Sequence, residues 1–321
     1  IILTVLAFYF HFYLNYRLMP NILLIIAAAN INVEHIMLML YRAALSSLMF
    51  MLIMVFLGLV NNYVMDRDAL AGTAYNLGFY HYSGFSLRFI AVLYLYLYIN
   101  KEKMTYVKIL IGIIASIITF LFTITRLQLI TCLGIIILYV LYYKLHIIDF
   151  RKKIFKYASI VIYPLVLVVY YVISFVQLFV SNGYFDLINE GVNGRLYFTV
   201  MAFDKYKVKL FGQKIEMVGA RDASGSIEDY FYIDSGYAYW LLALGFVFFV
   251  FMLMSYIRIM YKSYKYQDFA IFAIMLIMAF ANISNDFFTT FFAGFPLIVL
   301  LFADWNTRTI KHNSIKQLYY D

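Results

Sequence analysis

The sequence predicts an all-α, polytopic transmembrane helical bundle with about ten spans and one large extracytoplasmic loop that contains a short amphipathic helix. Composition is the first reason. Hydrophobic residues make up 65% and charged residues 13% of the chain, with a mean hydropathy of +0.84, whereas soluble domains carry about 25% charge. The second reason is that the apolar runs are continuous, without strict alternation, which favours helices over barrel strands. The third is one long polar segment, 181–235, between two apolar stretches.

The apolar runs define the expected spans, because a membrane-spanning helix needs about 20 apolar residues. They lie at 1–16, 20–33, 37–61, 84–100, 107–124, 127–143, 157–180, 236–261, 268–284 and 287–304. No low-complexity linker divides the chain and no convincing repeat occurs, so we expect one integral membrane domain over 1–321. The chain begins on Ile1, already inside an apolar run, and we expect it to be a fragment that lacks at least its start.

Lysine and arginine predict the orientation, since short cytoplasmic loops carry an excess of both. Four basic segments alternate along the chain so that they share one side: 101–108, 144–156, 258–265 and 308–316. The segment 181–235 falls on the other side, and in it eight acidic residues outnumber six basic ones. We therefore expect a multi-pass protein of the cytoplasmic membrane with this loop outside. Topology then explains the net charge of +8, which gives nucleic-acid binding no support.

Metal and cofactor chemistry find no support in the residue pattern. The single cysteine, Cys132, lies in an apolar stretch and has no second cysteine for a disulfide or a cysteine-based zinc site. We interpret it as a packing residue. Asp-rich metal motifs and Gly-rich nucleotide loops are both missing from the sequence. We therefore expect no metal and no cofactor.

Two arginines on the expected outer side are candidates for binding an anion. Arg126 occupies a very short connection between apolar helices, where a charge is costly unless it reaches water or a counter-charge. A snorkelling helix-end arginine is the alternative. Arg195 follows Gly194 and precedes apolar residues at i, i+4 and i+7, which predicts a short surface helix. In its first turn Arg195 would lie where phosphate is favoured; an ordinary surface arginine is the alternative.

Further polar residues belong to the same expected side. Arg88 is a third cation that would line one pocket with the other two, since guanidinium groups suit phosphate oxygens. Asp234 directly precedes an expected helix. It would either cap that helix or, as a partly buried carboxylate at the mouth of the cavity, act as a general base. His81 is a weaker candidate, because an interfacial histidine is the commoner role. Asn285 and Asp286 predict a tight outer turn.

These residues, taken in order, carry a resemblance to a known family. Its markers are Leu77-Gly78-Phe79 with His81, the Thr125-Arg126 turn, Gly194-Arg195 before an amphipathic stretch and Phe211-Gly212, and Tyr232-Ile-Asp-Ser-Gly-Tyr237 before a helix with Gly245. Over 37–304 the chain resembles the bacterial Wzy-like oligosaccharide repeat-unit polymerases, relatives of the O-antigen ligases. Two positions depart from that pattern: His81-Tyr82-Ser83 replaces a frequent His-Pro-Asn, and Thr125 replaces a frequent serine.

The resemblance implies a glycosyltransferase that polymerises undecaprenyl-pyrophosphate-linked oligosaccharide repeat units into surface polysaccharide such as O-antigen, capsule or exopolysaccharide. Transfer would be metal-independent and inverting, on the outer face of the cytoplasmic membrane, with release of undecaprenyl pyrophosphate. The implied partners are these lipid-linked glycans, membrane lipid, a flippase and a chain-length regulator. The implied catalytic residues are Arg126, Arg195 and Asp234, and the implied substrate-binding residues are Arg88, His81, Gly194 and Tyr237.

Three other functions stay open at this point. An O-antigen ligase would transfer finished glycan to another acceptor, but the ligases have His-Asn where this chain has Asp234-Ser235. A lipid-linked oligosaccharide flippase would need charges deep in its helices and often an internal repeat. Here the charges cluster at helix ends, with His11 the main exception. A non-catalytic membrane scaffold is the third.

Overall fold

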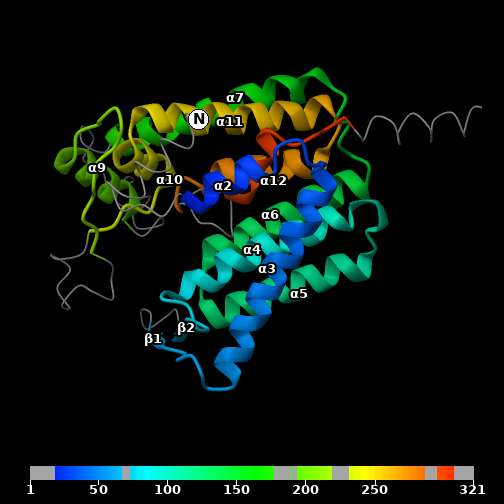
Figure 1. Cartoon of the computed structure of the whole chain (residues 1–321), viewed down its shortest axis with the longest axis horizontal. Helices are drawn as coiled ribbons and strands as arrows, with labels where there is room; N and C mark the ends of the chain where they lie inside the picture. Colours follow the sequence, from blue (N-terminus) through cyan, green and yellow to red (C-terminus); the bar gives the residue numbers. More distant parts are fainter. Residues whose placement is uncertain are drawn as a thin grey trace, which may run out of the picture.

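A computed structural model describes residues 19–66, 73–176, 189, 194–218, 231–285 and 295–306. Within these ranges the chain is a helical bundle (Figure 1). Six of its helices are long and apolar enough to cross a membrane: α3 (Val33–Phe56), α4 (Tyr82–Ile99), α5 (Tyr106–Thr123), α6 (Arg126–Tyr143), α7 (Lys153–Val176) and α11 (Phe246–Lys265). The prediction of a helical membrane protein is thereby confirmed. The expected count of about ten spans is not, and the span expected at 1–16 lies outside the described residues.

Three expected spans are shorter elements in the structure. Helix α2 (Met19–Ala27) has nine residues and α12 (Phe269–Ala281) has 13. Of the span expected at 287–304, residues 287–294 lie outside the described ranges, and the described part contains a 3-10 helix, η5 (Phe295–Leu301). At 1.5 Å per residue, α12 is about 20 Å long, less than the hydrocarbon thickness of about 30 Å. Helix α12 ends where the apolar run meets Asn282 and Ser284, and its buried residues pack inside the protein instead of facing lipid.

The single helix expected at 236–261 is broken in the structure. It consists of α10 (Gly236–Tyr239), a π-helical segment η4 (Trp240–Leu244), a break at Gly245 and then α11. Gly245 has φ +89° and Gly212 has φ +83°. A Cβ atom on Gly245 would lie 2.1 Å from the Gly212 nitrogen, so the two backbones meet only because both residues are glycine.

Backbone groups released by this break are bonded by the polar segment. Phe246 N donates to Lys209 O at 2.9 Å and Val247 N donates to Leu210 O at 3.1 Å. In return, Gln213 N donates to Ala243 O at 3.0 Å. Irregular backbone at membrane depth is tolerated where protein satisfies its polar groups. The stretch 209–213 therefore belongs to the helical body and is not a loose loop.

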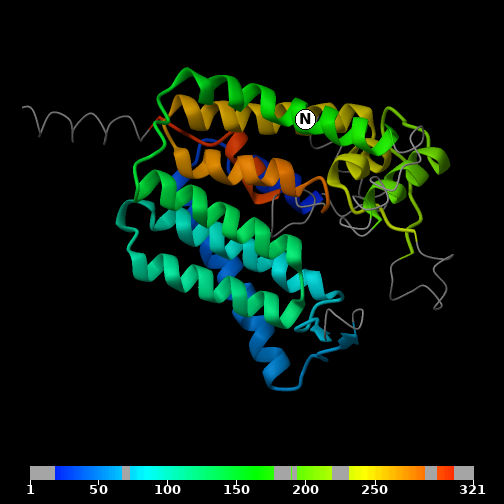
Figure 2. The same ribbon diagram turned by 180° about the vertical axis from the view of Figure 1, so that it is seen from behind.

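Three basic connections gather at one end of the bundle, which we call the basic end. Helices α4, α6 and α11 end there, and α5, α7 and α12 begin there (Figures 1 and 2). Lys101 Nζ lies 3.6 Å from Asp268 Oδ2, and Tyr264 OH donates to Arg151 O at 3.4 Å. These contacts join the connections at 100–105, 144–152 and 266–268, as the alternation of basic segments predicted. The fourth basic segment, 308–316, lies outside the described residues.

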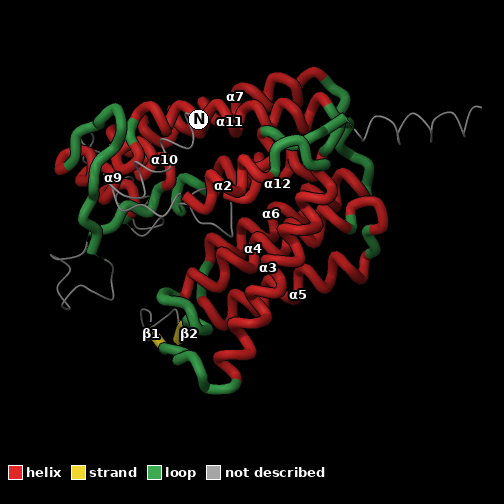
Figure 3. The backbone as a smooth tube through the Cα atoms, in the orientation of Figure 1, coloured by secondary structure: helices red, strands yellow, loops and turns green. Residues whose placement is uncertain are grey.

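The opposite end, which we call the site end, carries the elements β1 (Val64–Asp66), β2 (Thr73–Tyr75), α9 (Arg195–Lys205) and α10. A hairpin of β1 and β2, which the sequence analysis did not predict, precedes α4 (Figure 3). The predicted short helix is confirmed as α9. It buries Leu196, Thr199 and Ala202, and Phe203 packs edge-on against Tyr171 of α7 at 5.6 Å between ring centroids. Helix α9 therefore packs on the bundle.

Aromatic side chains connect the broken helix to α12 and α7. Trp240 and Tyr163 each stack on the ring of Tyr256, with centroid distances of 5.9 and 5.8 Å. Tyr163 OH donates to Met275 O at 3.0 Å, and Tyr237 OH donates to Ala279 O at 2.9 Å. Each hydroxyl thus satisfies its donor on the backbone of α12, as a buried phenol requires. The short α12 is held by its neighbours along its length.

The orientation of the bundle is open to a direct labelling test. In a Cys132→Ser background, which removes the only thiol, we expect Glu216→Cys at the site end to react with a membrane-impermeant maleimide in intact cells. Lys152→Cys at the basic end should react only after permeabilisation, because basic loops stay cytoplasmic. Both native side chains are exposed. Labelling in the reverse order would invert the predicted topology.

Candidate functional site

The structure brings Arg195 and Asp234 together across 39 residues of sequence. Arg195 Nε donates to Asp234 Oδ2 at 3.2 Å, and the two form an ion pair. Arg195 is the first residue of α9, and Asp234 lies two residues before α10. The two ends of the polar segment 181–235, each singled out in the sequence, therefore meet in one place.

Gly194 and Tyr170 position Arg195. Gly194 precedes α9 with φ +75°, a left-handed conformation that favours glycine. One turn into the helix, Thr199 Oγ1 donates to the Arg195 carbonyl at 2.9 Å. The Thr199 hydroxyl also shares a hydrogen bond of 2.5 Å with the hydroxyl of Tyr170 on α7. The start of α9 is thus fixed to a membrane-spanning helix.

Asp234 is positioned by the turn that opens α10. The helix is capped by Ser235, whose Oγ accepts from Ala238 N at 3.4 Å, so the alternative in which Asp234 is the cap is wrong. Gly236 N donates to Asn282 O at 3.1 Å, and a Cβ on Gly236 would lie 2.1 Å from Asn282 Oδ1. The cap and this close contact leave the Asp234 carboxylate outside the helix and directed at Arg195.

The surroundings of the ion pair raise the pKa of the Asp234 carboxyl group. The side chains of Arg195 and Asp234 are 22% and 25% exposed, so water reaches both but only in part. Burial raises the pKa of Asp234 above its ordinary value of 3.8, while the charge and the hydrogen bond of Arg195 act in the opposite direction. Burial is the larger influence on this pKa, because the charged form loses hydration. Such a carboxyl group is suited to accepting a proton.

The contact between the two side chains uses one edge of each. Only Nε of the guanidinium and Oδ2 of the carboxylate take part. In the described part of the chain, the two Nη atoms of Arg195 and the Oδ1 atom of Asp234 make no hydrogen bond or ion pair. Among the described residues, the four N–H donors on the two Nη atoms and one carboxylate oxygen are thus left to bind a ligand.

Asn282 is a buried polar residue that the sequence pattern did not single out. Its side chain has 0% exposure, and neither Oδ1 nor Nδ2 finds a hydrogen-bond partner among the described residues. A buried unsatisfied amide costs about 1–3 kcal/mol. The signal in the sequence was an asparagine directly after an apolar run. Asn285, which was predicted to be part of an outer turn, lies in the turn that follows α12. Asp286 lies outside the described residues.

Arg126 stands apart from the pair in its contacts. It opens α6 as an exposed side chain, directly after Ile124 with φ +50° and Thr125, whose hydroxyl shares a hydrogen bond of 2.8 Å with Thr123. Helix α6 begins at the same end of the bundle as α9 and α10 (Figure 1). No contact joins Arg126 to Arg195 or Asp234 among the residues that the structure describes. A pocket shared by all three stays a prediction.

The remaining site candidates have local structural roles. Arg88 Nη1 donates to Gly84 O at 2.7 Å, and its guanidinium carbon lies 4.2 Å from the Phe79 ring centroid. His81 caps α4, with Nδ1 2.8 Å from Ser83 Oγ. Tyr237 is fully buried, and its hydroxyl donates to the backbone of α12. Their proposed substrate contacts stay predictions.

Comparisons with protein-family models, with curated proteins and with solved structures each find no match for this chain. The described part of the chain contains no cluster of three or more His, Cys, Asp or Glu side chains that could hold a metal ion. The functional assignment therefore depends on the side chains at the site end.

The ion pair should couple the two residues energetically. In purified protein we expect Arg195→Gln and Asp234→Asn each to lower the stability, since each leaves a partly buried charge without its partner. The double variant should lose less than the sum of the two, with a coupling of about 1–3 kcal/mol in a double-mutant cycle on thermal or denaturant unfolding. Strictly additive losses would show that the contact contributes nothing.

Proposed function

We propose that the chain is a membrane glycosyltransferase that polymerises oligosaccharide repeat units carried on undecaprenyl pyrophosphate. The observation that carries this proposal is the Arg195–Asp234 pair, which lies at the bundle end opposite the basic connections. One member is a cation suited to a phosphate, and the other is a carboxylate suited to a proton. The two requirements of this transfer are thus met by adjacent side chains.

In the proposed reaction a hydroxyl oxygen of the acceptor sugar attacks the anomeric carbon of the donor glycan. The bond between that carbon and the pyrophosphate oxygen breaks, and undecaprenyl pyrophosphate leaves with the electron pair. The acceptor proton passes to the carboxylate of Asp234. Attack opposite to the leaving group inverts the configuration at the anomeric carbon. Atoms and charge balance without an oxidant or a nucleotide sugar, because the lipid pyrophosphate already activates the donor.

Arg195 would act on the charge that develops on the leaving group. Its Nε bonds to Asp234, and its Nη atoms make no hydrogen bond or ion pair with other residues that the structure describes. When Asp234 takes the acceptor proton its negative charge disappears, which weakens its attraction to Arg195 at the moment when the pyrophosphate gains charge. The guanidinium would then bind the leaving group more tightly in the transition state than in the ground state, which is the condition for catalysis.

Arg126 would supply a second cation to the same pyrophosphate. Its side chain is exposed at the start of α6, so it is able to reach a ligand in water or at the lipid surface. A pyrophosphate carries charge on two phosphoryl groups, and one guanidinium binds two oxygens at most in a fork. Two arginines on separate elements would therefore hold it better than one. The polyprenyl tail would extend along the apolar helices beside them.

Substitution of the arginines should separate polymerisation from the earlier steps. In cells that depend on this protein, we expect Arg195→Lys or Arg126→Ala to leave single lipid-linked repeat units on the outer face with no long polymer. The reason is that an amine or an alanine loses the forked contact with the pyrophosphate. Glycan length is read from gels of extracted polysaccharide, and protein insertion from an epitope tag.

Lys207→Ala is the matched control, since it removes an exposed cation from the same end of the bundle. This variant should make polymer of normal length. Normal polymer in both arginine variants would contradict the roles given to those residues. Repeat units retained on the inner face would instead favour the flippase, and long polymer that is not transferred to its final acceptor would favour the ligase.

The pH dependence of the transfer rate should reveal the protonation state of the Asp234 carboxyl group. A general base must be deprotonated, so in proteoliposomes the transfer rate should rise with pH through the pKa of this carboxyl group. Because burial raises that pKa, the acid limb should lie above the ordinary value of 3.8. Asp234→Asn should lower the rate by about 10²–10⁴ at pH values above this acid limb, and the difference should shrink below it, where the parent carboxyl is already protonated. An acid limb at or below 3.8, or an Asn variant with full activity, would exclude Asp234 as the base.

A further inference from the structure

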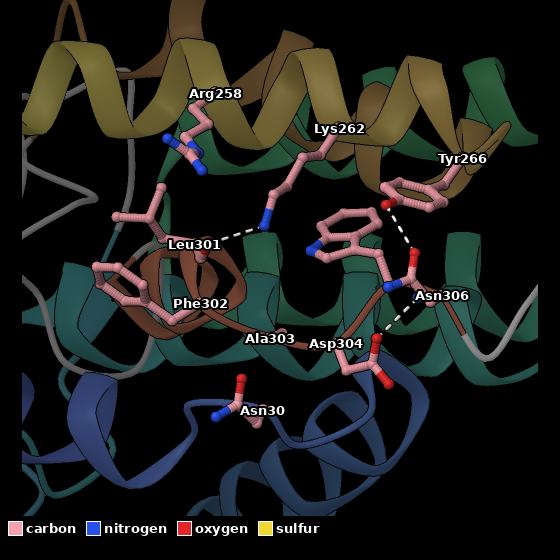
Figure 4. A pocket seen from close by; sticks show the side chains of 10 residues that line it. Asn30, Arg258, Lys262, Tyr266, Leu301, Phe302, Ala303, Asp304 and Asn306 are labelled. Carbon is pink, nitrogen blue, oxygen red and sulfur yellow. Dashed lines mark hydrogen bonds between the residues drawn. The ribbon is translucent and has the colours of Figure 1, made fainter.

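A second site candidate lies at the basic end, away from the Arg195–Asp234 pair. A cavity of about 460 Å³ opens there between the last turns of α11, the chain after η5 and the turn after α2 (Figure 4). The side chains that matter for its chemistry are Asn30, Arg258, Lys262, Tyr266, Asp304 and Trp305. No step of the proposed glycosyl transfer uses this cavity.

Two cations extend into the cavity from one face of α11. Arg258 and Lys262 are four residues apart, so their side chains are neighbours on the helix and both extend toward the chain after η5 (Figure 4). Lys262 Nζ donates to Leu301 O at 2.9 Å, which uses one of its three donors and fixes its position. Like charges at this spacing repel each other. An anion between them would remove that cost.

The carboxylate in the wall does not neutralise these cations by direct contact. Asp304 Oδ1 accepts from Asn306 N at 2.9 Å, and its carboxylate faces Asn306 in Figure 4. Within the described ranges, neither Arg258 nor Lys262 forms an ion pair. With two cations and one carboxylate, the charged lining has a net single positive charge. One phosphodiester carries one negative charge and would balance it.

The cavity is lined by two aromatic residues, Tyr266 and Trp305, of the kinds that are enriched at membrane–water interfaces. Trp305 and Tyr266 stack with 5.7 Å between ring centroids, and Lys262 Nζ lies 5.9 Å from the Trp305 ring. The Trp305 indole donates to Leu300 O at 3.0 Å. Tryptophan and tyrosine gather where apolar and aqueous surroundings meet. Arg258 and Lys262 lie in the C-terminal part of α11, so a membrane span by this helix would bring both cations near the lipid headgroups.

We propose that this cavity binds a phosphodiester, with Arg258 and the remaining donors of Lys262 on its phosphate oxygens and Asn30 available to a headgroup hydroxyl. A basic pocket among helix ends is a recognised arrangement for anionic lipid headgroups. The same phosphodiester chemistry also occurs in soluble molecules, so two sources are possible. The site is independent of the proposed polymerase reaction, because it lies at the opposite end of the bundle.

The test measures binding by the purified full chain in neutral detergent, with native mass spectrometry for the lipid and calorimetry for the soluble ligand. The probes are phosphatidylglycerol, diacylglycerol and the water-soluble glycerophosphoglycerol. We expect Arg258→Gln/Lys262→Gln to weaken binding of phosphatidylglycerol by about tenfold or more, because charge-assisted contacts are lost. Diacylglycerol, which lacks the phosphate, should bind weakly to all forms.

The matched control is Lys152→Gln/Lys153→Gln, which removes two exposed cations from the same end of the bundle but outside this cavity. The control should bind phosphatidylglycerol like the parent protein. Arg258→Lys/Lys262→Arg, which keeps both charges, should retain most of the binding and shows that the cavity still folds. Thermal unfolding without ligand checks the stability of each variant.

The soluble probe separates the two sources. Binding of phosphatidylglycerol without binding of glycerophosphoglycerol identifies a membrane lipid as the ligand. Comparable affinity for both, with the same loss in Arg258→Gln/Lys262→Gln, identifies a soluble phosphodiester. Equal affinity of the parent, the cavity variant and the control for phosphatidylglycerol would overturn the proposal. Equal binding of diacylglycerol would also overturn it. Polymer formation in cells is a separate readout, and its failure leaves these outcomes unchanged.

Discussion

The contact between Gly212 and Gly245 is the constraint on which the site end depends. A helix broken inside the bundle releases backbone donors and acceptors, and each unsatisfied group is costly at membrane depth. The stretch 209–213 bonds these groups at 2.9–3.1 Å, and it approaches closely enough only because both contact residues lack a Cβ. The break separates α10 and η4 from α11. Asp234, which lies just before α10, contacts Arg195.

From this break the structure assembles one polar site out of distant parts of the chain. Arg195 is held by α9, which is fixed to α7 through Thr199 and Tyr170. Asp234 lies before α10, whose start is capped by Ser235 and packs against Asn282 through Gly236. Because each residue belongs to a different packed element, the ion pair is a property of the assembled bundle. Its partial burial raises the pKa of the carboxyl group while leaving it accessible.

The two ends of the bundle differ in charge in a way that suits two kinds of phosphate contact. At the site end, Arg195 is paired with the carboxylate of Asp234 through its Nε atom, and its side chain is partly exposed. At the basic end, Arg258 and Lys262 lie next to each other on one face of α11, and neither forms an ion pair with another described residue. The first arrangement suits a charge that appears during a reaction, since the carboxylate balances the cation at rest. The second suits a charge that is permanently present.

The sequence by itself determined the helical membrane class, the alternation of basic connections and the short helix after Gly194. It also singled out Arg195 and Asp234 as site candidates, whose roles stay predictions. These follow from local composition and periodicity, which a single segment carries. Only the tertiary structure decided that the helix at 236–261 is broken, that 268–284 is too short to span, and that Ser235 rather than Asp234 caps α10. The same holds for the pairing of Arg195 with Asp234, the buried Asn282 and the cavity beside Arg258. The break, the ion pair, the buried Asn282 and the cavity depend on contacts between segments distant in sequence, which periodicity along one segment does not encode. The end of α12 and the Ser235 cap are local features, but periodicity does not fix the exact residue at which a helix begins or ends.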